Sequence, residues 1–233
     1  MNKICIGTIV QVKETFIDET TGQNIAGWKG RVRLIFDPTA EQPDAILFME
    51  WTAETIRQMP DSFILRSYES EAAWTVYYLP SSEVVPLAES HSEIESEWTK
   101  EAVCRRIFWP LFGREGRIME NVFKNDELPA DEFPLRYWYE FLRKNLTFPI
   151  KGSYDNPEED DGEEENPLQT GDRIRLTDLS GWGYPLGVLC ECEAAKDNRK
   201  YIVPLQDIDN VGTGVSKNDR YLVAYNLWMI CRN

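Results

Sequence analysis

The clearest strand pattern in the first half of the chain is RVRLI at residues 31–35. Its charged and apolar residues alternate, which is typical of a strand with one buried face. Strand-like runs also occur at residues 4–12, 45–49, 63–66 and 74–79. Short strands that recur at roughly ten-residue intervals predict a small β-barrel, which we place at residues 1–88.

Two helices are predicted next to these strands. Thr52 is placed to cap a short helix over residues 51–56. Ser90 and Glu93 form a capping box, and an apolar side chain then recurs every fourth residue until Pro110. Glycine, proline and charged residues dominate residues 113–131, so we expect a connecting helix and a linker over residues 89–131.

The second half combines helices with strands. Pro134 follows an acidic residue in the way that helix starts favour, and apolar residues then fall on one face. Strand patterns follow at residues 172–179, 186–193 and 200–204, and Tyr221, Tyr225 and Trp228 have the spacing of a closing helix. We expect a compact α+β, barrel-like domain over residues 132–233, in a chain that is mainly β with a few helices.

The net charge narrows the classes of partner. The chain has 40 acidic and 25 basic residues, a net charge of −15, and such an excess repels the phosphates of nucleic acids. No apolar run is long enough to cross a membrane, and the sequence lacks a secretory signal pattern at its start. We therefore expect a cytoplasmic protein that binds neither nucleic acid nor membranes, with a cation or a basic protein as partner.

Cysteine and histidine offer little chemistry. The five cysteines are scattered, and we expect them to be reduced. Cys190 and Cys192 share one face of a predicted strand, but no second pair completes a zinc site, which favours two small buried residues. The single histidine, His91, lies in a polar context, and no catalytic motif is present. We therefore expect no enzymatic activity.

Eight carboxylates lie between Asp155 and Glu165. Calcium takes six to eight oxygen ligands, and mutual repulsion among carboxylates favours uptake of a cation. A solvated acidic loop is the alternative, and composition alone favours it. With Gly162 at the sixth position of an EF-hand loop, Pro157 and Leu168 occupy the positions of the first and last ligands, so the segment is not an EF-hand.

Five short blocks in the second half carry a family resemblance. They read WYEFL at residues 138–142, LTFP at 146–149, PLQTGD at 167–172, GVLCE at 187–191 and VPLQDI at 203–208. In this order they resemble the CcbP-type calcium-binding family over about residues 132–233. The resemblance implies a calcium buffer or sensor without EF-hands. The acidic run lies between two of these blocks, so its carboxylates Asp155, Glu158, Asp160, Asp161 and Glu163 are the candidate calcium ligands, with Asp207 and Asp209 at the last block as weaker ones.

The first half resembles SH3-like barrels more loosely. GTIV at residues 7–10 and GWKGRV at residues 27–32 carry this likeness, which implies an interaction module. Trp28 in the second run and Trp182 in the turn GWGY, residues 181–184, are candidate partner-binding rings, although a turn that packs its ring inward is the more common arrangement. An alternative function is therefore an acidic adaptor or inhibitor-type protein that engages a basic partner.

Overall fold

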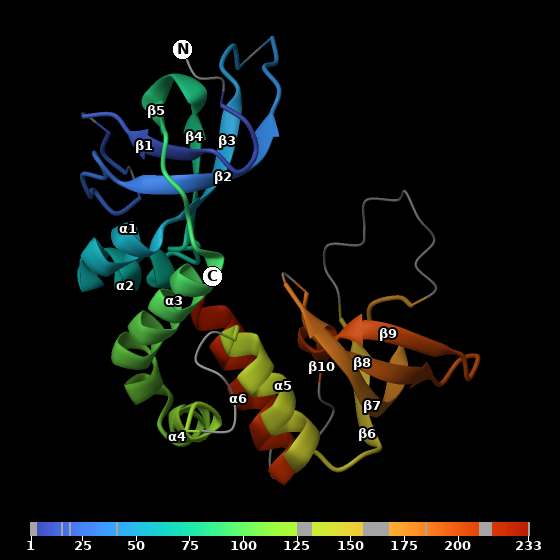
Figure 1. Cartoon of the computed structure of the whole chain (residues 1–233). Helices are drawn as coiled ribbons and strands as arrows, with labels where there is room; N and C mark the ends of the chain where they lie inside the picture. Colours follow the sequence, from blue (N-terminus) through green and yellow to red (C-terminus); the bar gives the residue numbers. More distant parts are fainter. Residues whose placement is uncertain are drawn as a thin grey trace. The chain divides into compact units, whose positions relative to one another are not determined.

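The computed structural model describes residues 4–14, 16–18, 20–40, 42–124, 132–155, 168–184, 186–209 and 216–232. The chain divides into two compact units (Figure 1). The first unit contains residues 1–108 and 231–233, and the second contains residues 109–230. In these described ranges, six helices and ten strands in two antiparallel sheets confirm the expected α+β class.

The first unit is built on a five-stranded antiparallel sheet in the order β4-β3-β2-β1-β5. A 3-10 turn, η1, joins β4 to β5, and β5 returns to pair with β1. Its elements are β1 (Ile9–Val12), β2 (Lys29–Phe36), β3 (Ile46–Trp51), α1 (Ala53–Gln58), α2 (Asp61–Glu69), β4 (Val76–Pro80), η1 (Ser81–Glu83), β5 (Val84–Leu87) and α3 (Glu93–Ile107).

The strand predicted at residues 31–35 is present as part of β2, but a bulge between Val32 and Leu34 shifts the alternation, so that Val32 faces the core and Leu34 faces outward. Val32, Leu47, Met49 and Leu79 are each at most 1% exposed on the inner face. Trp51 is completely buried at the end of β3 and packs edge-on against Trp28, with 5.4 Å between ring centroids. Large aromatic side chains of this kind contribute much of the apolar area that a small domain can bury.

Three local predictions for the first unit have different outcomes. The Thr52 hydroxyl accepts a hydrogen bond from the Thr55 amide at the start of α1, so the predicted cap is confirmed. The strand predicted at residues 63–66 is wrong, because Phe63, Ile64 and Ser67 form one buried face of helix α2. Helix α3 is present as predicted, but its capping hydroxyl belongs to Ser92.

The second unit repeats the strand order of the first. Its sheet runs β10-β6-β7-β8-β9, and a 3-10 turn, η4, joins β9 to β10, which pairs back with β6. Its elements are η2 (Trp109–Phe112), α4 (Arg114–Val122), α5 (Pro134–Asn145), β6 (Ile150–Tyr154), β7 (Arg173–Gly183), β8 (Gly187–Ala194), β9 (Lys200–Pro204), η4 (Leu205–Asp207), β10 (Ile208–Asp209) and α6 (Lys217–Cys231).

Helices α5 and α6 lie side by side in the second unit (Figure 1). Pro134 begins α5 at the predicted place, and Trp138 in its second turn is completely buried. The Trp138 ring packs against Tyr225 and Trp228 of α6, with centroid distances of 5.5 and 5.6 Å. The predicted helices at both ends of this unit are therefore confirmed.

Residues expected to form a linker include a packed helix. Helix α4 occupies residues 114–122, and its Met119 and Val122 are at most 1% exposed. Gly116 of this helix approaches the Trp109 carbonyl so closely that an added Cβ would lie 2.1 Å from the oxygen. Glycine in this stretch therefore serves close packing rather than chain flexibility.

Within the described ranges, no helix combines the length and the apolar character needed to span a membrane.

Candidate functional site

The carboxylates predicted to bind calcium begin where β6 pairs with β10. Ile208 lies opposite Tyr154, and Asp209 lies opposite Ser153. One residue further, the Asp155 amide donates a 2.8 Å hydrogen bond to the Asp207 carbonyl. The antiparallel pairing therefore holds Asp155, where the acidic run starts, directly beside Asp207, which is distant in sequence.

Asp155 and Asp209 are exposed and Asp207 is half-buried at this edge of the sheet. The three aspartates do not form a ligand set by themselves, because no group of three or more His, Cys, Asp or Glu side chains among the described residues is arranged to hold a metal ion. Four of the predicted ligands, Glu158, Asp160, Asp161 and Glu163, lie outside the described residues. The structure thus brings together the two ends of the predicted ligand set.

The cysteine pair on β8 is part of the core. Cys190 and Cys192 are both completely buried, and the Cys190 thiol donates a hydrogen bond to the Val203 carbonyl. Burial raises the pKa of Cys192 to about 11. Burial, followed by the neighbouring Cys192 and Asp207, raises the pKa of Cys190 further. Both thiols therefore stay protonated near neutral pH, unlike the thiolates that bind zinc.

The two tryptophans considered for partner binding are placed differently. Trp28 lies in the core of the first unit, and its ring packs edge-on against Phe63 with 5.0 Å between centroids. Trp182 lies near the end of β7, is half-buried and faces the Phe133 ring at 6.4 Å. Trp28 is therefore a core residue whose ring packs inside the first unit, whereas the Trp182 ring is partly accessible to solvent.

A buried network of charges in the first unit was not predicted from the sequence. Lys100 of α3 donates hydrogen bonds to Glu50 of β3 and, at 2.8 Å, to Glu97 one turn earlier. Arg232 donates to Glu97 and, at 2.9 Å, to Glu101. The pairing of Lys100 with Glu97 at helical spacing is visible in the sequence, but nothing there indicates that Arg232 joins them.

A second branch of the network reaches β2. Arg33 donates to both Glu50 (Nε to Oε2, 2.7 Å) and Glu93 (Nη1 to Oε1, 2.8 Å), and Arg31 also pairs with Glu93. Burial opposes the charged form of Glu50, but Lys100 and Arg33 outweigh it and hold the pKa of this carboxyl below its ordinary value. These carboxylates have internal cationic partners and therefore leave little negative charge to attract an external cation.

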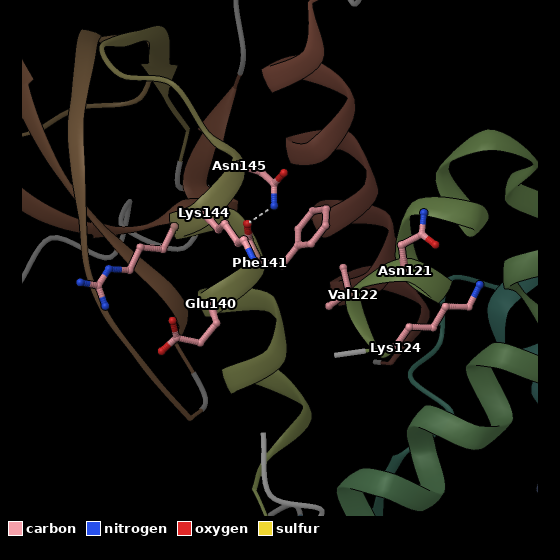
Figure 2. A pocket seen from close by; sticks show the side chains of 8 residues that line it. Asn121, Val122, Lys124, Glu140, Phe141, Lys144 and Asn145 are labelled. Atoms are coloured by element: carbon pink, nitrogen blue, oxygen red, sulfur yellow. Dashed lines mark hydrogen bonds between the residues drawn. The ribbon is translucent and has the colours of Figure 1, made fainter. Parts of the chain in front are cut away.

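A pocket of about 540 Å³ opens between α4 and α5 of the second unit (Figure 2). Phe141 and Val122 form its apolar part, and the Asn145 side chain donates a 2.9 Å hydrogen bond to the Phe141 carbonyl. Its charged lining residues are one carboxylate and three cations: Glu140, Lys124, Arg143 and Lys144. Because cations predominate, the pocket has the wrong polarity for calcium.

The crystal structure of Anabaena CcbP is similar to this structure. The match covers 51% of this chain and 90% of the CcbP chain, with a TM-score of 0.38 and 16% sequence identity. This is a weak structural resemblance to CcbP. No family model matches the sequence, and no curated protein matches it.

Proposed function

We propose that this protein is a cytoplasmic, non-enzymatic calcium buffer or sensor that binds the ion without an EF-hand. The ligands would be carboxylates of the second unit, with the acidic run from Asp155 to Glu165 as the main source. The observation that carries this proposal is the pairing of β6 with β10, which holds Asp155 beside Asp207. Carboxylates that start at one edge of a sheet lose less conformational freedom on binding than those of an unattached chain.

Electrostatics supports the same assignment. Asp155 and Asp209 form no ion pair with any residue in the described part of the chain. Calcium would relieve the repulsion between these carboxylates and those of the acidic run. In the first unit, by contrast, Glu50 and Glu97 already face cations. An added cation is therefore expected in the second unit.

Isothermal titration calorimetry of calcium into the chelator-treated full chain, with millimolar magnesium present, tests the proposal. We expect saturable binding at micromolar to sub-millimolar calcium. Asp160→Asn/Asp161→Asn and Asp155→Asn/Asp207→Asn should each weaken it by about tenfold or more, because each pair removes two charged ligands. Asp61→Asn, an exposed change in the first unit, is the matched control. Heat no greater than dilution, or equal loss in the control, would contradict the proposal.

Protein binding is a second candidate function, favoured by one observation. Leu34, Phe36 and Tyr78 of the first unit are 50%, 48% and 58% exposed and lie on one sheet. Together with the net charge of −15, such residues are consistent with an acidic adaptor that engages a basic partner.

A further inference from the structure

Six apolar residues cover part of the outer face of strands β2, β3 and β4. They form two rows across the strands. One row is Leu34, Phe48 and Tyr78, and the other is Phe36, Ile46 and Pro80. Directly opposed residues of antiparallel strands project from the same face, so these six form one surface, which we call the aromatic face.

The rings of the aromatic face are in mutual contact. Tyr78 lies 4.9 Å from Phe48 and 6.2 Å from Phe36 between ring centroids. The alternate residues of these strands, such as Leu47 and Leu79, fill the core, so the sheet buries its other face. Contiguous exposed apolar residues of this kind mark interaction surfaces more often than singly exposed ones do.

The second sheet is an internal control, because it has the same strand order. The two sheets can be matched at the proline of their edge strands, Pro80 in β4 and Pro204 in β9. Two residues before these prolines lie Tyr78 and Ile202. The row through Tyr78 is Leu34, Phe48 and Tyr78, and the row through Ile202 is Asp178, Glu191 and Ile202. Two carboxylates thus occupy the places of Leu34 and Phe48. The next row, Gly181, Leu189 and Pro204, contains no aromatic ring. This sheet order therefore does not require an aromatic outer face.

Charges border the aromatic face on two sides. On one side Glu50 is buried beneath Lys100, so helix α3 covers the sheet there. On the other side the described residues of the β2–β3 connection include Asp37 and Asp44 and no basic residue. A partner that covers the apolar rows therefore meets an acidic rim.

We propose that the aromatic face docks a protein segment with an apolar or aromatic centre flanked by lysine or arginine. The apolar centre would cover Leu34, Phe36 and Tyr78, and the basic flanks would approach Asp37 and Asp44. A second copy of this chain fits less well, because it brings the same acidic connection and another fifteen negative charges. The inference rests on the second candidate function and is independent of calcium binding.

Selection from a random twelve-residue peptide library against the immobilised full chain tests whether the aromatic face docks such a segment. Fluorescence anisotropy then measures the enriched peptides on the wild type, on Phe36→Ser/Tyr78→Ser and on the control Ile202→Ser. Ile202 is 63% exposed at the matching place in the second sheet. We expect enriched peptides with an apolar centre and basic flanks. Their affinity should fall by about tenfold or more in the double variant and stay unchanged in the control.

Three other results would overturn the inference, and each would point to a different explanation. Equal affinity for the wild type and the double variant would leave an acidic adaptor that binds basic peptides by charge alone, without the aromatic face. Absence of enrichment would reject the second candidate function together with the docking segment. Light scattering that shows a dimer, lost in the double variant, would assign the face to a second copy. Thermal unfolding of each variant verifies that it is folded.

Discussion

The two sheets of this protein share one strand order and use their acidic residues in opposite ways. In the first unit, Glu50 and Glu97 are buried and bound by Lys100 and other cations. In the second unit, Asp155 and Asp209 are exposed at the β6–β10 edge. Buried carboxylates need a fixed cationic partner, whereas exposed ones remain available to a mobile ion. The contrast indicates that the buried carboxylates of the first unit support its stability, and it is consistent with the proposal that exposed carboxylates of the second unit bind calcium.

Removing the central cation of the first unit should have the largest effect. Lys100→Met leaves Glu50 and Glu97 buried with one partner fewer each. Loss of one partner from a buried ion pair costs about 3–5 kcal/mol, so we expect the free energy of unfolding to fall by about that amount. Denaturant unfolding measures it.

Arg106→Met is the matched control for this change. Its partner is Asp61, and both side chains are more than half exposed, so the expected cost is at most about 1 kcal/mol. Equal losses in the two variants would show that the buried network contributes no more to the free energy of unfolding than a surface ion pair does. The proposed structural role of the first unit's buried carboxylates would then be wrong.

Acid should remove the contribution of the same network. Cations outweigh burial and lower the pKa of Glu50 and of Glu97 below the ordinary value of 4.5. A folded-state pKa below the unfolded one gives stability that is present above pH 4.5 and lost as the pH falls through the folded-state pKa. We therefore expect the difference between wild type and Lys100→Met to be full near neutral pH and to shrink below pH 4.5. A constant difference across this range would contradict the assignment.

How far the sequence predicts this structure depends on the range of the interactions. The strand pattern at residues 31–35 and Pro134 at a helix start are local signals, and both elements are confirmed, although the bulge after Val32 turns Leu34 outward. The run at residues 63–66 is too short to separate a strand from one helical face, so that prediction failed. The buried network joins α3 to β3 and to Arg232, contacts that no local pattern encodes.

The candidate site was predictable in the same limited way. The acidic run from Asp155 is plain in the sequence, as is the VPLQDI block that contains Asp207. Their proximity depends on the register of β6 and β10, which only the fold supplies. The aromatic face was missed because its residues come from three strands whose pairing includes a bulge between Val32 and Leu34.

A moderate effect is expected from disturbing the β6–β10 edge. Gly152 of β6 lies against the neighbouring strand β10. A Cβ added to it would lie 2.8 Å from both the Asp209 carbonyl oxygen and the Ile208 side chain. Gly152→Ala should push β10 outward and lower the free energy of unfolding by about 1–3 kcal/mol. Because it separates Asp155 from Asp207, the calcium titration should weaken as well. Gly181→Ala, where an added Cβ meets nothing within 4 Å, is the control.

The smallest change in stability is expected at the aromatic face, where it separates a docking role from a structural one. Tyr78 is 58% exposed, so Tyr78→Ser removes mainly its cross-strand contacts with Phe48 and Phe36. Such pairs contribute roughly 0.2–1 kcal/mol each, and we expect a loss of about 1 kcal/mol or less in denaturant unfolding. A loss of about 3 kcal/mol, as for a core aromatic, would mean that the first sheet keeps its aromatic rows for its own folding. A small loss would mean that the first sheet does not need the aromatic rows to fold, which supports a docking role. The second sheet already folds with Asp178 and Glu191 at the corresponding places.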